Sequence, residues 1–132
     1  GRGGLDEQGY FYFKGRKDDL INSSGYRIGP SEIENTILSI DEVEMAAVVG
    51  VPDDLRGQII KAVIVPRNKT YIDSQNPELK DKIKNKVKNK LAAHEYPRII
   101  EFVNELPLTT TGKIKRNIIR EKHLRKINER KI

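Results

Sequence analysis

Two apolar stretches rich in β-branched residues limit what this chain can fold into. Residues 43–51 and 59–65 consist mostly of valine, isoleucine and alanine, and Pro52-Asp53-Asp54 interrupts them. Apolar β-branched runs bounded by turn-forming residues predict strands. Pro66 ends the second strand, and the polar residues 67–76 that follow predict a loop. The middle of the chain is therefore expected to supply the strands of a sheet.

A helix is predicted directly before these strands. Residues 29–31 read Gly-Pro-Ser, which suits a helix start with Pro30 in the first turn. Ser31 and Glu34 have the spacing of a capping box. The residues expected to form its buried stripe are Ile33, Ile37, Leu38 and Ile40.

Two more helices are predicted in the second half. One starts at Asn76-Pro77, and its apolar residues recur every four positions while lysines cover the other faces. Those apolar residues are Leu79, Ile83, Val87 and Leu91. The other runs from Arg116 to Ile132 and is strongly basic. Its expected packing residues are Ile119, Leu124 and Ile127.

Shorter segments complete the predicted fold. Residues 20–21 and 26–28 flank Asn22-Ser23-Ser24-Gly25, which favours a hairpin with Gly25 at positive φ. Residues 10–13 are aromatic and prone to form a strand, and residues 99–103 predict another. Strands and helices do not alternate strictly, so the fold class is expected to be α+β. We expect an N-terminal β-hairpin followed by a small, mostly antiparallel sheet flanked by helices.

Composition excludes several classes of site. A chain of 132 residues fits one domain, residues 1–132, and the absence of Cys excludes disulfides and Cys-based zinc sites. His94 and His123 lie far apart without ligand spacing, so no metal site is expected. No apolar run predicts a membrane span, no signal-peptide pattern opens the chain, and a cytoplasmic location is expected. Because Gly1 stands where Met would start a gene product, a piece of a longer protein is expected.

Charge is distributed unevenly along the chain. Residues 1–76 hold 9 Lys/Arg against 12 Asp/Glu, whereas residues 77–132 hold 16 against 7. A basic half can attract nucleic acid, a membrane surface or a phosphorylated small molecule, although a solvated lysine-rich surface explains it equally well. Thr111-Gly112-Lys113 is similar to the end of a P-loop. Pro107 and Ile114 replace the required Gly and Ser/Thr, which excludes that motif.

Two longer segments are more specific. The first, residues 15–34, reads GRKDDLINSSGYRIGPSEIE, and the second, residues 106–116, reads LPLTTTGKIKR. Together they resemble the C-terminal lid domain of adenylate-forming enzymes, the superfamily of acyl-CoA synthetases, luciferases and peptide synthetases. The resemblance covers about residues 6–122, and residues 22–32 are most similar to acetyl- and medium-chain acyl-CoA synthetases.

The resemblance implies a function in two steps. A carboxylate attacks the α-phosphate of ATP to give an acyl-adenylate and pyrophosphate, and the thiol of CoA then displaces AMP. The lid would rotate to present a different loop in each step to a large N-terminal adenylation domain, its own partner, which this chain lacks. ATP with Mg²⁺ and CoA would be substrates rather than bound cofactors, ATP and Mg²⁺ being held mainly by that missing domain. The isolated lid is expected to be folded but inactive.

The resemblance also implies roles for single residues in adenylation. Lys113 matches the adenylation lysine, whose ammonium can neutralise the charge that gathers on the reacting carboxylate and phosphate. Arg16 matches an arginine on the ATP ribose, and Arg27 is expected to contact phosphate. Asp18 matches the hinge residue, with Asp19 as the alternative.

The thioester step would use other residues. These expected CoA-binding residues are Ser24, Gly25, Arg27, Arg56 and Lys88. Gly25 would let the pantetheine arm pass close to the backbone because glycine has no Cβ. Glu32 and Glu34 are interpreted as structural residues that favour the helix dipole.

Three alternatives remain open at this stage. A related lid could serve an adenylating enzyme that loads a carrier protein instead of CoA. The basic second half could belong to a nucleic-acid-binding module, whose affinity would fall steeply with salt. A non-catalytic interaction domain is the third.

Overall fold

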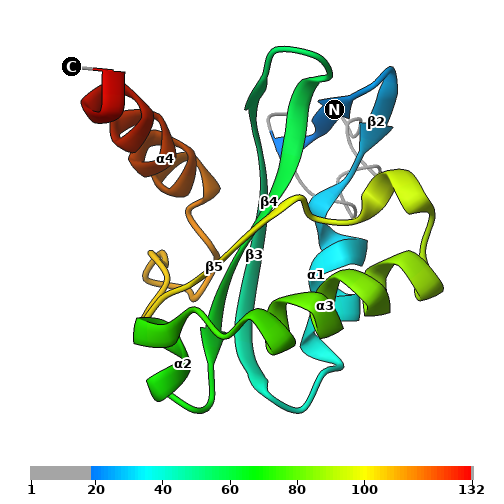
Figure 1. Cartoon of the computed structure of the whole chain (residues 1–132). Coiled ribbons are helices and arrows are strands. Elements are labelled where there is room, and N and C mark those ends of the chain that lie inside the picture. The colour runs from blue at the N-terminus through cyan, green and yellow to red at the C-terminus, as the bar shows by residue number, and fades with distance from the viewer. Residues whose placement is uncertain (1–18, 132) are drawn as a thin grey trace.

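The computed structural model describes residues 19–131 (Figure 1). The expected strand at residues 10–13, Arg16 and Asp18 lie outside these described residues. A short 3-10 helix, Ala93–Glu95, follows the third of four α-helices. In chain order the other elements are β1 (Ile21–Ser23), β2 (Tyr26–Ile28), α1 (Pro30–Leu38), β3 (Val43–Asp53), β4 (Gly57–Pro66), α2 (Thr70–Ser74), α3 (Pro77–Lys90), β5 (Ile99–Phe102) and α4 (Arg116–Lys131).

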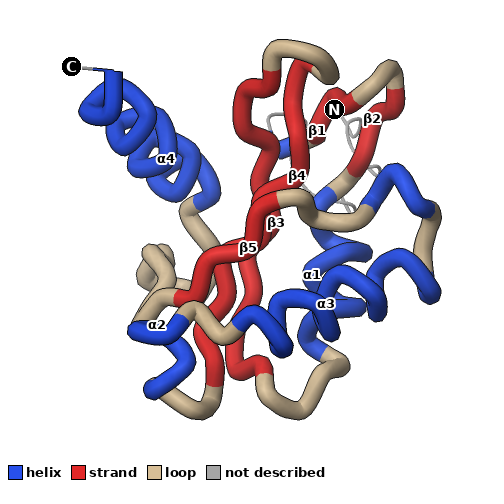
Figure 2. Tube along the Cα trace, in the orientation of Figure 1, coloured by secondary structure: helices blue, strands red, loops and turns tan. Residues whose placement is uncertain are grey.

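One sheet of five strands forms the centre of the domain (Figure 2). β3 and β4 form a long antiparallel pair, and the other edge of β4 pairs with β1 at Gly57 and with β5 from Lys61 to Ile64. β5 runs parallel to β4, whereas the other pairings are antiparallel. The α+β class, with an initial hairpin and a mostly antiparallel sheet flanked by helices, is confirmed.

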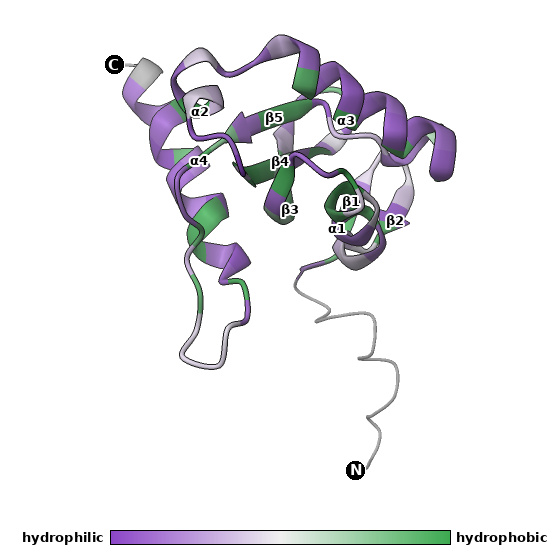
Figure 3. Ribbon diagram, turned by 90° about the horizontal axis from the view of Figure 1, so that it is seen from below, coloured by the Kyte–Doolittle hydropathy of each residue, from purple (hydrophilic) through white to green (hydrophobic). Residues whose placement is uncertain are grey.

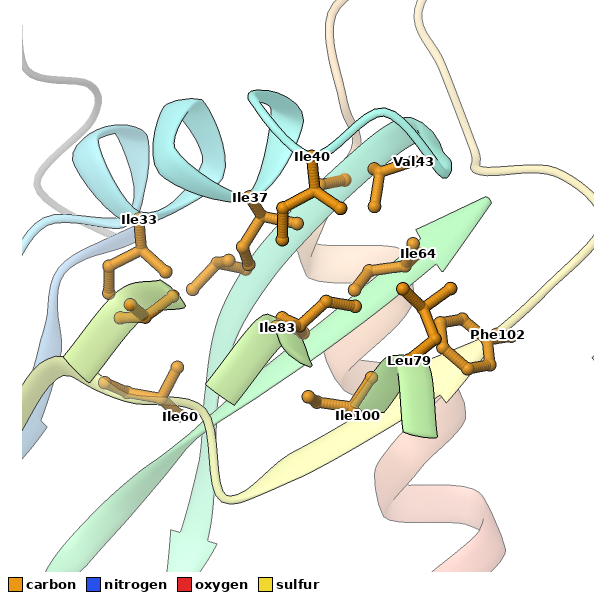
Figure 4. Packing of buried hydrophobic residues seen from close by; sticks show 14 of the residues in the cluster. Ile33, Ile37, Ile40, Val43, Ile60, Ile64, Leu79, Ile83, Ile100 and Phe102 are labelled. Atoms are coloured by element: carbon orange, nitrogen blue, oxygen red, sulfur yellow. The ribbon is translucent and has the colours of Figure 1, made fainter. Parts of the chain in front are cut away.

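The sheet has an apolar layer on each face. Successive side chains of a strand point to opposite faces, so Val48 of β3 joins the layer beneath α1 and α3, while Val49 joins the layer that includes Ile119 of α4. The first layer is larger: Figure 4 shows isoleucines of α1 and α3 meeting those of β4 and β5, with Phe102 beside Leu79 at one end of the cluster. Because both faces are covered, residues 43–51 form an almost continuous apolar run.

β3 continues through Pro52, where the sequence predicted a break. Pro52 pairs with Gln58 and Asp53 pairs with Gly57, so the two strands end together at the turn. β3 lies at the edge of the sheet, where a proline's missing N–H costs no bond to a further strand. The turn at residues 54–56 therefore lies at the end of the long β3–β4 ribbon that is farthest from α2 (Figure 1).

Helix α1 starts at Pro30 as predicted, but two expectations for it are wrong. Gly29 is the N-cap and no side chain caps the helix, so Ser31 and Glu34 do not form a capping box. Glu34 is instead buried and accepts the N–H of Val48 at 2.8 Å. Leu38 is 44% exposed because the buried stripe ends at Ile37 and resumes at Ile40 after the helix.

The other helices also differ in detail from the prediction. Residues 67–76 contain the short helix α2 rather than only a loop. α3 agrees with its predicted start, since Asn76 Oδ1 accepts the N–H of Leu79 at 2.9 Å. In α4, Ile119 is buried, but Leu124 is 42% exposed because the C-terminal part of the helix extends away from the sheet. No helix in the described part of the chain is long and apolar enough to cross a membrane.

Candidate functional site

The predicted lysine lies on a compact loop, residues 107–115, which we call the lysine loop. Leu108 and Ile114 form a β-bridge, the N–H of Thr109 donates to the carbonyl of Lys113 at 2.7 Å, and the N–H of Lys115 donates to the carbonyl of Pro107 at 2.9 Å. These bonds close the loop on itself. Its shape therefore depends on its own residues rather than on the sheet.

The tip of the lysine loop combines a glycine turn with hydroxyl groups. Gly112 has a φ of +87°, and no atom lies within 4 Å of where its Cβ would be. Thr109 Oγ1 accepts the N–H of Lys113 at 3.0 Å and lies 3.1 Å from Thr111 Oγ1. Lys113 itself is exposed. The loop thus presents an ammonium group beside an open backbone turn, an arrangement that can approach an anionic group closely.

The second predicted site is the turn between β1 and β2. Ser24 and Gly25 have φ values of 52° and 86°, which fits a two-residue turn of the type that joins tightly twisted hairpins. The predicted hairpin and the positive φ of Gly25 are confirmed. No atom lies within 4 Å of a Cβ built on Gly25, so the backbone of this turn is open to a ligand.

The β1–β2 turn is held against the β3–β4 turn. The N–H of Ser24 donates to the carbonyl of Arg56 at 3.0 Å, and Gln58 Oε1 accepts the N–H of Asn22 at 2.8 Å. The structure therefore brings Arg56 next to Ser24 and Gly25, although Arg56 lies more than thirty residues later in the sequence. The Arg56 guanidinium lies 3.4 Å from Asp53 Oδ2 and is only partly exposed.

An open hollow of about 1060 Å³ lies between β2, α1 and the end of α3. Arg27 lines it together with Lys86, Lys90 and His94. The ring of Tyr26 stacks on His94 with centroids 3.8 Å apart and an angle of 7° between the planes. Glu32 and Glu95 also line the hollow, so its charge is mixed, and its Arg and Lys side chains are the groups that suit a phosphate.

Lys88 does not line this hollow. Its ammonium lies 4.5 Å from the centroid of the Tyr96 ring, and its position two residues from Lys86 and Lys90 puts it on the other side of α3. Lys86 and Lys90 were missed by the motif comparison, which aligned a single basic position in a helix full of lysines. Their spacing of four residues, which puts both on one helix face, was the available signal.

The lysine loop and the β1–β2 turn lie in different parts of the domain. In Figure 1 the turn lies at the tip of the hairpin that carries the label β2, whereas the lysine loop lies on the other side of the domain, beside β5 and the start of α4. Figure 3 shows the same separation from below. Lys113 is thus separated from the group formed by Ser24, Gly25 and Arg56.

A partly buried ion-pair network, centred on the buried carboxylates of Asp19 and Glu34, adjoins the lysine loop at Arg116. The Arg116 guanidinium contacts Glu34 Oε1 at 2.6 Å and Asp19 Oδ2 at 3.2 Å, and Arg120 approaches Asp19 Oδ1 at 3.7 Å. Although burial opposes a charge there, hydrogen bonds and attraction from Glu34 and Asp19 raise the pKa of Arg116 above its ordinary value. The interpretation of Glu34 as a partner of the helix dipole is incomplete, because its carboxylate also binds Arg116.

A second cluster of charged side chains joins α4 to β4 and β5, on the face of the sheet that α1 and α3 do not cover. Lys61 is 4% exposed; its ammonium lies 3.0 Å from Glu101 Oε1 and 3.0 Å from His123 Nδ1. Lys126 contacts Glu101 Oε2 at 2.8 Å. Burial opposes the carboxylate charge, but hydrogen bonds from Lys126 and Lys61 lower the pKa of Glu101. Within residues 19–131, no group of three or more His, Cys, Asp or Glu could hold a metal ion.

Comparison with known proteins identifies the family to which this fold belongs. The sequence model of the AMP-binding enzyme C-terminal domain matches residues 32–113, and the chain belongs to this family. A mitochondrial acyl-coenzyme A synthetase of Mus musculus is 47% identical over 92% of this chain, and 4-hydroxybutyrate–CoA ligase 1 of Metallosphaera sedula is 50% identical over 89%. The crystal structure of Brucella canis acyl-CoA synthetase matches with a TM-score of 0.77 and 46% identity over 85% of the chain. The resemblance to acyl-CoA synthetases is confirmed.

Two facts from the relatives qualify the sequence analysis. The chain spans 21% of the Mus musculus synthetase, 20% of the Metallosphaera sedula ligase and 20% of the Brucella canis chain. The expected cytoplasmic location is wrong: the synthetases of Mus musculus and Homo sapiens among the relatives are named as mitochondrial, which points away from the cytoplasm.

Proposed function

We propose that this chain is the rotating C-terminal domain of an AMP-forming acyl-CoA synthetase. The observation that carries the proposal is the exposed Lys113 on a loop separated from an open glycine turn, within a domain of this family. A rotation of the domain would then bring one of the two segments at a time to the reacting atoms on an adenylation domain. The relatives are named as synthetases and ligases, which favours catalysis over a nucleic-acid-binding or purely structural role.

In the first step, the proposed role of Lys113 is electrostatic. An oxygen of the substrate carboxylate attacks the α-phosphorus of ATP, and the bond to pyrophosphate breaks. Negative charge gathers between carboxylate and phosphate, and an ammonium there lowers the barrier by neutralising it. The Thr109 hydroxyl accepts the N–H of Lys113 and is itself in contact with the Thr111 hydroxyl, so the lysine side chain starts from a fixed position.

In the second step, the β1–β2 turn would line the path of CoA. The thiolate sulfur attacks the acyl carbonyl carbon, and AMP leaves. Gly25 offers backbone without a side chain in the way, and the bond from the N–H of Ser24 to the carbonyl of Arg56 holds Arg56 beside the turn. Arg27, with Lys86 and Lys90 in the adjoining hollow, would attract the phosphates of CoA or AMP, with Lys88 as a more distant cation.

Two proposed residues lie before the described part of the chain. Arg16 would bind the ribose hydroxyls of ATP, and Asp18 would be the hinge. ATP and Mg²⁺ would be held mainly by the adenylation domain. The proposed substrates are a carboxylic acid of the acetyl or medium-chain class, ATP and CoA.

The full-length protein should form acyl-CoA, AMP and pyrophosphate from ATP, CoA and a short- or medium-chain acid. A panel from acetate to dodecanoate, with CoA or a carrier protein as acceptor, would identify both substrates by the products formed. Equal amounts of AMP and acyl-CoA support the proposal. Transfer to the carrier protein alone, or no ATP cleavage with any acid, contradicts it.

A further inference from the structure

The orientation of the lysine loop is determined at its ends rather than along its length. The bonds between Thr109 and Lys113, and between Lys115 and Pro107, close the loop internally. At one end, Leu106 is buried in the apolar layer beneath α4. At the other end the chain passes directly into α4 at Arg116. A shift of either end would move the ammonium of Lys113 as a unit with its loop.

Arg116 fixes the second of these ends by three hydrogen bonds. Its Nε donates to Glu34 Oε2 at 3.1 Å, one terminal nitrogen donates to Glu34 Oε1 at 2.6 Å, and the other donates to Asp19 Oδ2 at 3.2 Å. The side chains of Arg116, Glu34 and Asp19 are only 16%, 9% and 10% exposed. A planar guanidinium can hold two carboxylates in fixed directions, which an ammonium cannot.

The three residues of this network come from three separate parts of the chain, and each part has its own place in the proposed mechanism. Asp19 is the first described residue and follows the proposed hinge, Asp18. Glu34 belongs to α1, directly after the β1–β2 hairpin, and its carboxylate is itself anchored by the N–H of Val48 in β3. Arg116 directly follows the lysine loop. The network thus connects the start of the domain, the block that carries the glycine turn and the stem of the lysine loop.

We propose that Arg116 is a positioning residue for Lys113, holding the stem of the lysine loop to α1 and to Asp19 so that the ammonium is presented in a fixed direction. This inference rests on the proposed function of Lys113 in adenylation. It also makes Asp19 part of the rotating body, so the pivot lies before it in the chain. Arg116 touches no reacting atom and acts through the loop.

The test uses the full-length protein and measures the two half-reactions separately. Adenylation is followed as pyrophosphate release, and thioester formation is followed from a supplied acyl-adenylate and CoA. Arg116→Met should lower kcat for adenylation about tenfold to a hundredfold, because a displacement near 1 Å can cost that much, while the KM for ATP changes less than about twofold. Thioester formation should also stay within about twofold. Lys126→Met removes an ion pair of the same helix and should leave both half-reactions unchanged.

A second variant guards against simple misfolding. Arg116→Lys keeps the positive charge that the two buried carboxylates need, so the domain should fold. It loses the planar guanidinium that donates to both carboxylates in fixed directions, so adenylation should fall by an intermediate amount. Adding Arg116→Lys to Lys113→Ala should cause no further loss of adenylation, because the loop then has no ammonium to position. A purely structural role would lower both half-reactions and would act equally in the Lys113→Ala background.

The possible failures are distinguishable. If Lys113→Ala abolishes adenylation but the Arg116 variants change both half-reactions equally, or change neither, the positioning role is overturned and the proposed function stands. If Lys113→Ala retains normal adenylation, the proposed function fails and the role of Arg116 fails with it. A selective loss of adenylation in both Arg116 variants supports both proposals.

Discussion

Single glycines illustrate what a motif can and cannot say about a residue. The sequence favoured positive φ at Gly25 because asparagine, serine and glycine precede a strand, and the structure has φ +86° there with open space around it. Gly50 carries no such signal, since it lies within an apolar strand. Its Cβ would lie 2.9 Å from Ile21 Cγ2 and 3.0 Å from Gln58 Oε1. Only the packed structure shows that this position must stay small.

These two glycines give a comparative prediction at the residue scale. Gly25→Ala should destabilise the chain by about 1 kcal/mol, because the left-handed backbone is strained for alanine but nothing is displaced. Gly50→Ala should cost about 1–3 kcal/mol by overpacking, because it pushes on Gln58 and so on the bond to Asn22 that holds the β1–β2 hairpin. Urea unfolding of the 132-residue chain measures both. A larger loss for Gly25→Ala than for Gly50→Ala would contradict the account.

At the scale of elements, the buried apolar contact of α4 with the sheet comes from the first half of the helix, and Lys126 in the second half adds an ion pair. Ile119 is buried against the apolar layer of β3 and β4, whereas Leu124 is 42% exposed. Arg116 and Lys126 add ion pairs to α1 and β5. The helix is therefore held by few contacts, and each of them should be measurable on its own.

Ile119 and Leu124 form a matched pair on this helix. Ile119→Ala should destabilise the chain by about 2–4 kcal/mol, because it leaves a cavity under α4. Leu124→Ala should change stability by less than about 0.5 kcal/mol, as expected for an exposed position. Hydrogen exchange should show faster exchange in residues 116–131 for Ile119→Ala only. Equal effects of the two variants would mean that α4 does not pack as described.

The ion pairs of Glu101 predict a pH dependence of stability. Its pKa in the folded chain lies below the ordinary value of 4.5, so the carboxylate stabilises the fold above about pH 4.5, and this contribution is lost as pH falls through the lowered pKa. Glu101→Gln should therefore reduce the thermal stability at pH 7 and flatten its decline between about pH 5 and 3.

Glu42→Gln is the control for Glu101→Gln. The pKa of Glu42 is also lowered, mainly by a hydrogen bond from Lys82, but this pair is exposed at the surface. Its effect should be smaller, because exposed pairs contribute little. Thermal unfolding followed by circular dichroism from pH 3 to 7 compares the two. Parallel curves for wild type and Glu101→Gln would contradict the role given to Glu101.

For the whole molecule, local patterns predicted most elements but not the way they meet. The hairpin, α1, α3 and the central strands follow from periodicity and turn residues, and the two motif segments predicted the family. The ion pair between Arg116 and Glu34 joins residues 82 positions apart, and no local pattern reports such a pairing. The edge position that lets β3 continue through Pro52 is likewise a property of the sheet order.

The candidate site shows the same division. The motifs predicted roles for Lys113, Gly25 and Arg56 one by one, and the structure adds that the Gly25 turn adjoins Arg56 while the lysine loop lies elsewhere. The lysines were hardest to rank, because a helix with lysine at every second position offers a cation to each of its faces. Which of them face the hollow depends on how α3 is rotated against the sheet.

The most direct test of the central claim compares Lys113→Ala and Gly25→Leu in the full-length protein, after thermal unfolding has shown both to be folded. Adenylation is measured as pyrophosphate release, and thioester formation is measured from a supplied acyl-adenylate and CoA. Two segments that serve different steps require opposite losses: Lys113→Ala should lose adenylation and retain thioester formation, and Gly25→Leu should do the reverse. Equal damage by both substitutions to the same half-reaction would contradict the account.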